Sequence, residues 1–307
     1  MSQSTIAGVC PVLPTVFDDA GGLDHAGVAA VVDYVVASGA EGTVFPGLAS
    51  EYDMLSLDER EALIATVGEA VDGRIGFIVG ASSDSVADSV RLAQAGVRAG
   101  ASAAMVMTPR TLGGDLAAIG AFYEELGRSA GVPILLQNAP APMGLGLTPE
   151  QVVAVAASTD AIRWVKEETM PCGQRISALR AAAQAGGAVP HLAGVFGGAG
   201  GRYLVDELHR GAIGSMPAAE TPEIHVALMA AHRRGDEATV RGLYEALLPI
   251  LMVQAVFRWR LTKEVLVRRG VIASAHTRAA GPAFDAEDME ELDVILARLE
   301  DAHRRLA

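Results

Sequence analysis

The chain has 307 residues, of which 50% are hydrophobic and only 5% aromatic, and its net charge is −13 at pH 7. Because the chain is strongly acidic and its arginines are scattered, we expect neither a nucleic-acid partner nor binding to an anionic membrane. The two cysteines, Cys10 and Cys172, form no disulfide framework and no metal-binding spacing. We expect no signal peptide and no membrane-spanning segment, and we therefore predict a cytoplasmic protein.

Strand-like and helix-like segments alternate from the N-terminus onward. Short apolar segments are followed by helix starts, which are marked by Asp24, by Ser56 with Glu59, and by Thr148 before Pro149. The predicted strands cover residues 9–17, 42–46, 74–80, 103–107, 133–136, a segment that contains Lys166, 189–195 and 212–216.

Eight such units predict an α/β fold, a (β/α)8 TIM barrel over residues 1–232. The alternative is a doubly wound open sheet, which needs a glycine-rich phosphate loop after its first strand. Residues 18–22 read Asp-Asp-Ala-Gly-Gly instead. Residues 233–307 carry apolar residues at helical spacing and predict a C-terminal helical extension packed on the barrel.

Lys166 lies near the end of the sixth apolar segment, and only one other lysine, Lys263, occurs in the chain. At a surface position, arginine would serve as well as lysine. A buried lysine can lose its proton and attack a carbonyl group, which a guanidinium cannot do. The alternative is that Lys166 has no catalytic role and that its side chain only extends from the strand end to solvent. Since barrel enzymes place their chemistry at the carboxyl ends of the strands, we predict that Lys166 is the nucleophile.

Several further motifs occur in a fixed order along the chain. They are residues 14–17 with Asp24, residues 47–51 with Leu55, Ser56, Glu59 and Arg60, residues 80–83, 106–109, 165–167 and 211–215, and Lys263. With this order and spacing, the chain from about Pro11 to its C-terminus resembles the dihydrodipicolinate synthase / N-acetylneuraminate lyase superfamily of class I aldolases. The resemblance implies that Lys166 forms an imine with a small 2-oxo acid. It also implies no cofactor beyond that imine, no metal, and a homotetramer or homodimer.

The sequence departs from the family pattern in the loop after the second strand. This loop usually reads Gly-Thr/Ser-Thr-Gly-Glu, but Leu48, Ala49 and Ser50 replace its middle. Two hydroxyls that usually help to bind the substrate carboxylate are therefore missing. We expect the N–H groups of Ala49 and Ser50, with the Ser50 hydroxyl, to hold the carboxylate instead.

Three more departures concern the fourth and fifth strands. Arg110 and Thr111 replace the synthase's pair of tyrosines, and Pro142 aligns with the arginine that recognises its second carboxylate. Gln137 replaces the tyrosine that shuttles protons. These changes argue against authentic dihydrodipicolinate synthase activity.

The segments Gln137-Asn138-Ala139-Pro140 and Lys166-Glu167-Glu168 resemble the branch of the family that dehydrates 2-keto-3-deoxy sugar acids, such as 2-keto-3-deoxyarabonate, and this resemblance implies dehydration. It needs no base on the C4 hydroxyl, only a base at C3 and an acid for the leaving group. The predicted catalytic residues are Lys166, Gln137, Ser50 and Glu168, and strand alternation should place Glu168 beside Lys166. The predicted substrate-binding residues are Ala49, Ser50, Asn138, Arg110, Gly194 and Ser215.

Four other functions remain open at this stage. The first two are a pyruvate-releasing aldolase and an enzyme like dihydrodipicolinate synthase. The third is a hydroxy-pyrroline carboxylate deaminase, and the fourth a non-catalytic homologue that only binds 2-oxo acids. The glycine-rich residues 197–201 resemble a phosphate cradle but lack the lysine and serine or threonine of a P-loop, so we predict a loop that lines the pocket.

Overall fold

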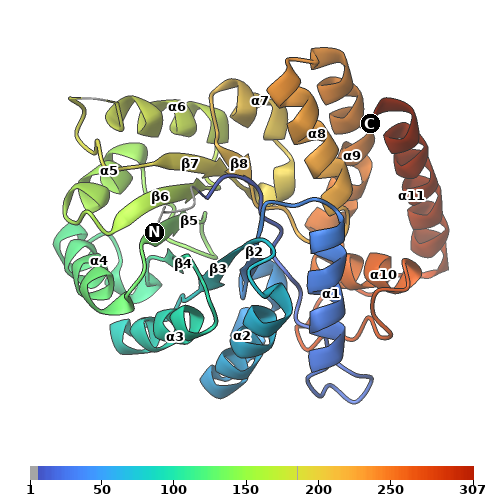
Figure 1. The fold of residues 1–307 in the computed structure, drawn as a ribbon, viewed down its shortest axis with the longest axis horizontal. Helices are drawn as coiled ribbons and strands as arrows, with labels where there is room; N and C mark the ends of the chain where they lie inside the picture. The colour runs from blue at the N-terminus through green and yellow to red at the C-terminus, as the bar shows by residue number, and fades with distance from the viewer. Residues whose placement is uncertain (1–5, 185) are drawn as a thin grey trace.

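The computed structural model describes residues 6–184 and 186–307, and over this part of the chain it forms an eight-stranded parallel sheet (Figure 1). The strands are β1 (Gly8–Val9), β2 (Gly42–Phe45), β3 (Gly76–Gly80), β4 (Ala103–Met107), β5 (Ile134–Asn138), β6 (Ile162–Glu167), β7 (Gly194–Gly197) and β8 (Gly214–Ser215). Their order is β1-β8-β7-β6-β5-β4-β3-β2, and a parallel bridge between Val12 and Val44 brings the two ends together. The predicted (β/α)8 barrel is confirmed.

Helices surround this barrel on the outside. They are α1 (His25–Ala37), α2 (Leu57–Val71), α3 (Val86–Arg98), α4 (Leu116–Ala130), α5 (Pro149–Ala157), α6 (Cys172–Ala182), α7 (Leu204–His209) and α8 (Pro222–Arg234). The predicted caps are confirmed where α2 begins, because Ser56 accepts a hydrogen bond from the N–H of Glu59 and Glu59 accepts one from the N–H of Ser56. These reciprocal bonds satisfy N–H groups that the helix itself cannot.

Several predicted strands differ from the observed ones by one or two residues at an end, and two differ by more. The first regular strand covers only Gly8–Val9 instead of residues 9–17, since Pro11 and Pro14 have no N–H to offer a neighbouring strand. The seventh runs over Gly194–Gly197 instead of residues 189–195. Val189 is fully buried in the loop before it, so its apolar side chain covers the core without belonging to the sheet.

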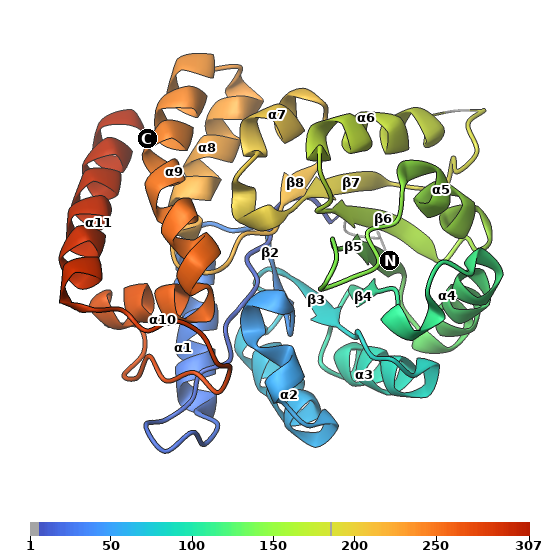
Figure 2. The ribbon, with the colours of Figure 1, turned by 180° about the vertical axis from the view of Figure 1, so that it is seen from behind.

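The C-terminal helices α9 (Glu237–Phe257), α10 (Trp259–Arg268) and α11 (Ala286–Leu306) confirm the predicted helical extension. Figure 2 shows them together beside α8 and α1 at one side of the barrel. Leu228 of α8, Leu247 of α9 and Leu299 of α11 are fully buried in one cluster, so the extension shares a core with the barrel's own helices. The boundary at residue 233 stays a prediction.

By length and composition alone, α9 is the one helix of the described residues that could cross a membrane, with a mean hydropathy of 1.4 over its 18-residue window. One such helix does not establish a membrane span, because core helices of globular proteins meet the same criteria. Here α9 packs against α8, α10 and α11. On its outer face Met252 and Val256 are 59% and 57% exposed.

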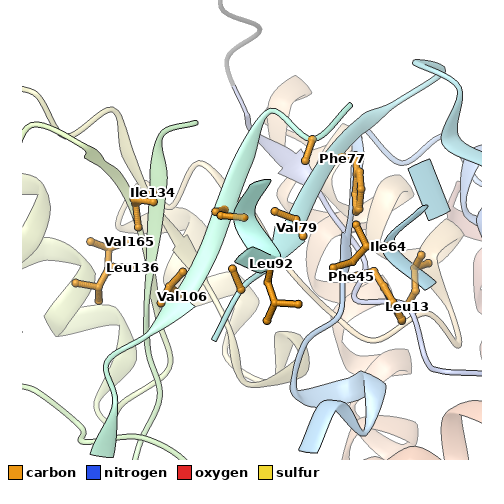
Figure 3. Packing of buried hydrophobic residues seen from close by; sticks show 14 of the residues in the cluster. Leu13, Phe45, Ile64, Phe77, Val79, Leu92, Val106, Ile134, Leu136 and Val165 are labelled. Carbon is orange, nitrogen blue, oxygen red and sulfur yellow. The ribbon is translucent and has the colours of Figure 1, made fainter. Parts of the chain in front are cut away.

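Strand alternation divides the core in two and thereby orients the site. Residues such as Val106, Leu136 and Val165 point outward and pack under the helices (Figure 3). Trp164 belongs to a separate cluster with Met105. Because neighbours along a strand face opposite sides, Lys166 lies on the side of Trp164, inside the barrel.

Candidate active site

A cavity of about 280 Å³ lies at the carboxyl ends of the strands. Lys166 and Glu168 line it from the end of β6, and Ala49 lines it from the loop after β2. Further lining residues follow β7 or come from the C-terminal extension: Ala199, Gly200, Arg202, Gln254, Arg258, Trp259 and Thr262. The cavity is thus shared between the barrel and the extension.

Lys166 is buried, with 4% of its surface exposed. Its Nζ atom lies 3.2 Å from Oε1 of Glu168, and the two side chains are 5% and 10% exposed. The prediction that strand alternation brings Glu168 beside Lys166 is confirmed. A buried amine and a carboxylate thus face the same small cavity.

Glu168 is held in place by two further contacts. Its Oε2 accepts a hydrogen bond of 2.6 Å from Nε2 of Gln137, which lies beside Lys166 in the β5–β6 register. Its Oε1 accepts a bond of 3.3 Å from the N–H of Ala199 in the glycine-rich loop. A Cβ atom on Gly198 would lie 2.2 Å from Cγ of Glu168, so this loop needs glycine to approach the carboxylate. Lys166, Gln137 and Glu168 therefore form one connected group.

The loop after β2 contains a short helical turn over Leu48–Ser50. The prediction that the Ser50 hydroxyl faces substrate is wrong, because Ser50 is fully buried and its hydroxyl donates to the carbonyl of Leu13. The same hydroxyl accepts a 2.9 Å bond from the N–H of Gly47, and the Ser50 N–H donates to the Gly47 carbonyl. The first N–H groups of the turn, those of Leu48 and Ala49, have no acceptor within it.

A buried ion pair fixes the end of this loop. Glu51 has a φ of 53° and is fully buried, and its Oε1 lies 2.5 Å from Nζ of Lys263, which is also fully buried. Its Oε2 accepts a 2.7 Å bond from the N–H of Ala279. Burial lowers the pKa of Lys263 to about 8. Lys263 thus ties the loop after β2 to α10, and Glu51 has a structural role in this loop.

Asn138 does not face the cavity, so its predicted contact with substrate is wrong. Its Nδ2 donates 2.9 Å bonds to Oε2 of Glu167 and to the carbonyl of Leu147, and its Oδ1 accepts the N–H of Leu147. All of these partners lie on the outer side of the strand. Asn138 therefore holds the loop between β5 and α5.

Three other predicted binding residues also lie outside the cavity. Arg110 is exposed, donates to the carbonyl of Pro142 at 2.8 Å, and lines an adjoining groove that shares Leu48, Met143, Arg258 and Trp259 with the cavity. Gly194 begins β7 at the level of Trp164, two residues before the level of Lys166, and thus lies toward the amino end of the barrel. Ser215 is fully buried and its Oγ has no hydrogen-bond partner among the described residues.

Arg202, Gln254 and Arg258 were not predicted from the sequence. Arg202 follows the glycine-rich loop, whereas the other two come from the end of α9. Their one sequence signal is the position of Arg202 directly after a loop predicted to line the pocket. The helical spacing of apolar residues in the extension predicts helices, but it does not indicate that Gln254 and Arg258 reach the mouth of the barrel.

Another buried carboxyl group, that of Glu207, lies behind the site. Glu207 is fully buried, and burial raises its pKa to about 7. The thiol of Cys172 donates to its Oε1 at 3.0 Å, and burial also raises the pKa of that thiol. Cys172 therefore stays protonated and is no nucleophile.

Comparisons with known proteins identify relatives over nearly the whole chain. Residues 5–299 match the dihydrodipicolinate synthetase family. L-2-keto-3-deoxyarabonate dehydratase of Azospirillum brasilense is 30% identical over 297 residues, which cover 95% of this chain and 94% of that protein. The putative 2-dehydro-3-deoxy-D-gluconate aldolase YagE of Escherichia coli K12 is 28% identical over 304 residues, 97% of this chain and 99% of YagE.

Solved structures are similar over the same length. The crystal structure of YagE in complex with pyruvate has a TM-score of 0.87 at 26% identity and covers 97% of this chain and 99% of its own. Dihydrodipicolinate synthase from Rhodopseudomonas palustris has a TM-score of 0.88 at 27% identity, with 96% and 98% covered.

Proposed function

The chain belongs to the dihydrodipicolinate synthetase family of lyases, and from that premise we propose that it dehydrates a 2-keto-3-deoxy sugar acid through an imine on Lys166. One observation carries the proposal. Lys166 is buried at the end of β6 and faces a cavity in which Glu168, bonded to Gln137, is its nearest carboxylate. The dehydratase among its relatives supports the choice of substrate class.

The first step is attack of the neutral Lys166 amine on the C2 carbonyl of the substrate. The carbinolamine takes up one proton from solvent and loses water, which gives a protonated imine that withdraws electrons from C3; the same proton is released when the imine is hydrolysed at the end. The N–H groups of Leu48 and Ala49 are placed to hold the C1 carboxylate, because they begin a helical turn and have no acceptor within it. No cofactor is needed beyond this imine.

Glu168 is the proposed proton carrier for the elimination. It removes a proton from C3, and the electron pair forms an enamine with C2. The enamine then expels the C4 hydroxyl, which leaves as water with the proton that Glu168 has taken up. Hydrolysis of the new imine consumes one water, returns the product and restores Lys166, so atoms and charges balance.

Gln137 favours dehydration over aldol cleavage. Cleavage between C3 and C4 requires a base that removes the proton of the C4 hydroxyl. The amide of Gln137 carries no titratable proton and is already engaged with Glu168 at 2.6 Å. In this arrangement Gln137 orients Glu168 and takes no part in proton transfer.

A pyruvate-releasing aldolase is the second candidate, since two similar proteins of Escherichia coli K12 are named as a putative and a probable aldolase. Incubation with 2-keto-3-deoxyarabonate separates the two reactions. We expect a product lighter than the substrate by one water and no pyruvate in a lactate dehydrogenase assay. Stoichiometric pyruvate would establish the aldolase instead, and ammonia release from a hydroxy-pyrroline carboxylate would establish the deaminase.

The proposed assembly is a homotetramer or homodimer in the cytoplasm. The exposed apolar side chains of Met252 and Val256 on α9 support a contact between subunits. Light scattering of the purified protein measures its mass directly. A monomer at micromolar concentration would contradict this part of the proposal.

A further inference from the structure

We infer that Arg202 and Arg258 form a second anion-binding subsite at the outer end of the cavity, and that the substrate is a 2-oxo acid with a second anionic group at its distal end. This inference rests on the proposed imine chemistry and narrows its substrate class to 2-keto-3-deoxy sugar acids with a distal carboxylate or phosphate. 2-Keto-3-deoxyarabonate, which has no distal anion, should then be dehydrated with a higher KM than such an acid. The distal group is a carboxylate or a phosphate, because both match the planar fork of a guanidinium.

Arg202 is fixed before any ligand binds. Its Nε donates to the carbonyl of Leu251 at 3.2 Å, its Nη1 to the carbonyl of Ala199 at 2.7 Å, and its Nη2 to Oε1 of Gln254 at 2.6 Å. All three acceptors are neutral. Since a guanidinium has five N–H donors, two remain for a ligand, one on each terminal nitrogen.

Arg258 lies at the break between α9 and α10, where its backbone has a φ of 47°. Non-glycine residues rarely adopt such a conformation, and it persists only where the surroundings enforce it. Its guanidinium stacks on the indole ring of Trp259 at 4.3 Å from the ring centroid. The indole N–H in turn donates to the carbonyl of Leu48 at 2.7 Å, which ties this platform to the loop after β2.

Neither arginine has a carboxylate partner among the ion pairs of residues 6–184 and 186–307. Burial is the main cause of the lowered pKa of Arg202. Tyr203, Glu220 and Glu168 raise this pKa, whereas the charge of Arg258 lowers it. Arg202 is partly buried and Arg258 is exposed, and their two guanidinium groups repel each other at the outer end of the cavity. Such an arrangement gains stability when an anion lies between them.

The charge of the cavity points to the same ligand. Its lining includes three cationic side chains, Lys166, Arg202 and Arg258, and one carboxylate, Glu168. The chain as a whole carries −13, so this excess of positive charge is local. The three cations and one carboxylate leave an excess of two positive charges, because the protonated imine keeps the charge of Lys166. The C1 carboxylate of a 2-oxo acid offsets one of these two charges. One positive charge remains for a distal anion.

The position of this subsite also differs from that expected by resemblance. In dihydrodipicolinate synthase, which this chain resembles, an arginine at the position of Pro142 recognises the second carboxylate. Arg202 and Arg258 instead approach from the loop after β7 and from the extension. The substrate chain would therefore run from the loop after β2, past Lys166, to these two residues.

The test compares ligands of equal length that differ only at the distal end. Adipate and hexanoate are titrated calorimetrically, because they bind without the 2-oxo group and so without an imine. In parallel, borohydride traps pyruvate, 2-oxohexanoate and 2-oxoadipate on the protein over a range of concentrations. Arg202→Gln and Arg258→Gln are compared with Arg241→Gln, which removes an exposed arginine of α9 paired with Glu237.

We expect the natural chain to prefer adipate over hexanoate, and 2-oxoadipate over 2-oxohexanoate, by about 10- to 100-fold. Each subsite variant should lose most of this preference, and Arg241→Gln should keep it. Equal binding of adipate and hexanoate by the natural chain would overturn the subsite. A preference for adipate that survives when Arg202→Gln and Arg258→Gln are combined would also overturn it. Failure to trap pyruvate would instead overturn the imine chemistry, so the two failures are distinguishable.

Two further ligands identify the distal group. 2-Keto-3-deoxy-6-phosphogluconate is compared with 2-keto-3-deoxygluconate in the same trapping assay. The preference for the phosphorylated acid over 2-keto-3-deoxygluconate is compared with the preference for 2-oxoadipate over 2-oxohexanoate. If the first is larger, the subsite binds phosphate; if it is smaller, the subsite binds a carboxylate. If 2-keto-3-deoxygluconate, which has no distal anionic group, binds better than both ligands that carry one, the arginines bind hydroxyl groups and the inference is wrong.

Discussion

Glu168 makes three polar contacts on the cavity side of the barrel, with Lys166, Gln137 and Ala199. No other carboxylate lines this cavity in the described part of the chain. A single carboxylate in contact with the amine is well placed both to take the C3 proton and to return it to the leaving hydroxyl.

Glu168→Gln should therefore uncouple imine formation from turnover. We expect kcat to fall by about 100- to 10,000-fold, the usual contribution of a general acid–base group. Borohydride trapping of pyruvate on Lys166 should persist, because the amine remains. Steady-state kinetics and adduct mass are measured on the same preparation. If kcat changes by less than a few-fold, Glu168 only shapes the pocket.

At the scale of elements, two loops position this carboxylate and the substrate. The loop after β7 approaches Glu168 so closely that a Cβ on Gly198 would lie 2.2 Å from its Cγ. The loop after β2 depends instead on the buried pair of Glu51 and Lys263. Both loops are thus held by contacts between residues far apart in sequence.

Gly198→Ala should displace Glu168 and lower kcat by about 100-fold, which is the cost of a misplacement on the order of 1 Å. The matched control is Gly281→Ala, where an added Cβ meets nothing within 4 Å. Kinetics of both variants, with thermal unfolding to confirm folding, test this prediction. Equal kinetics in the two variants would show that the loop tolerates the added methyl group.

Lys263→Met should destabilise the fold, because it leaves the Glu51 carboxylate buried without its cation. Breaking a buried ion pair in this way costs about 3–5 kcal/mol. Urea denaturation measures the loss, and Lys263→Met combined with Glu51→Gln should recover part of it. Arg241→Gln, which breaks an exposed pair, should change the free energy of unfolding by less than about 1 kcal/mol. An equally small loss for Lys263→Met would refute the structural role.

At the scale of the whole molecule, stability should depend on pH through Glu207. Its pKa is raised from 4.5 to about 7 by burial, so the folded state holds its proton more tightly than the unfolded chain does. The stabilisation of the neutral form is full below pH 4.5 and is lost as pH rises through about 7. The loss is at most on the order of 3 kcal/mol, from the size of the pKa shift.

Glu207→Gln removes this titration while keeping the shape of the side chain. We expect the natural chain to lose stability relative to the variant between pH 4.5 and about pH 7, as measured by urea denaturation at each pH. If the free energy of unfolding changes with pH in the same way in the two proteins, Glu207 does not titrate in this range.

The barrel, its helical extension and the proximity of Lys166 and Glu168 were predictable from the sequence, because they depend on periodicity and strand alternation. Ser50 and Asn138 were assigned wrongly for a physical reason. Their type allows contact with substrate, but buried hydroxyl and amide groups must find partners, and those partners come from distant segments. Arg258 was missed because the path of the extension across the barrel mouth depends on tertiary packing. Arg202 was missed because its orientation depends on contacts with Leu251 and Gln254 of that extension.

The most direct test of the account is borohydride trapping with pyruvate, followed by peptide mass analysis. The account predicts an adduct on the peptide that contains Lys166, and its loss in Lys166→Ala. It also predicts no adduct on the only other lysine, Lys263, which is buried against Glu51. An adduct on Lys263, or none with pyruvate or any other 2-oxo acid, would contradict imine chemistry at Lys166 and favour a protein that only binds 2-oxo acids.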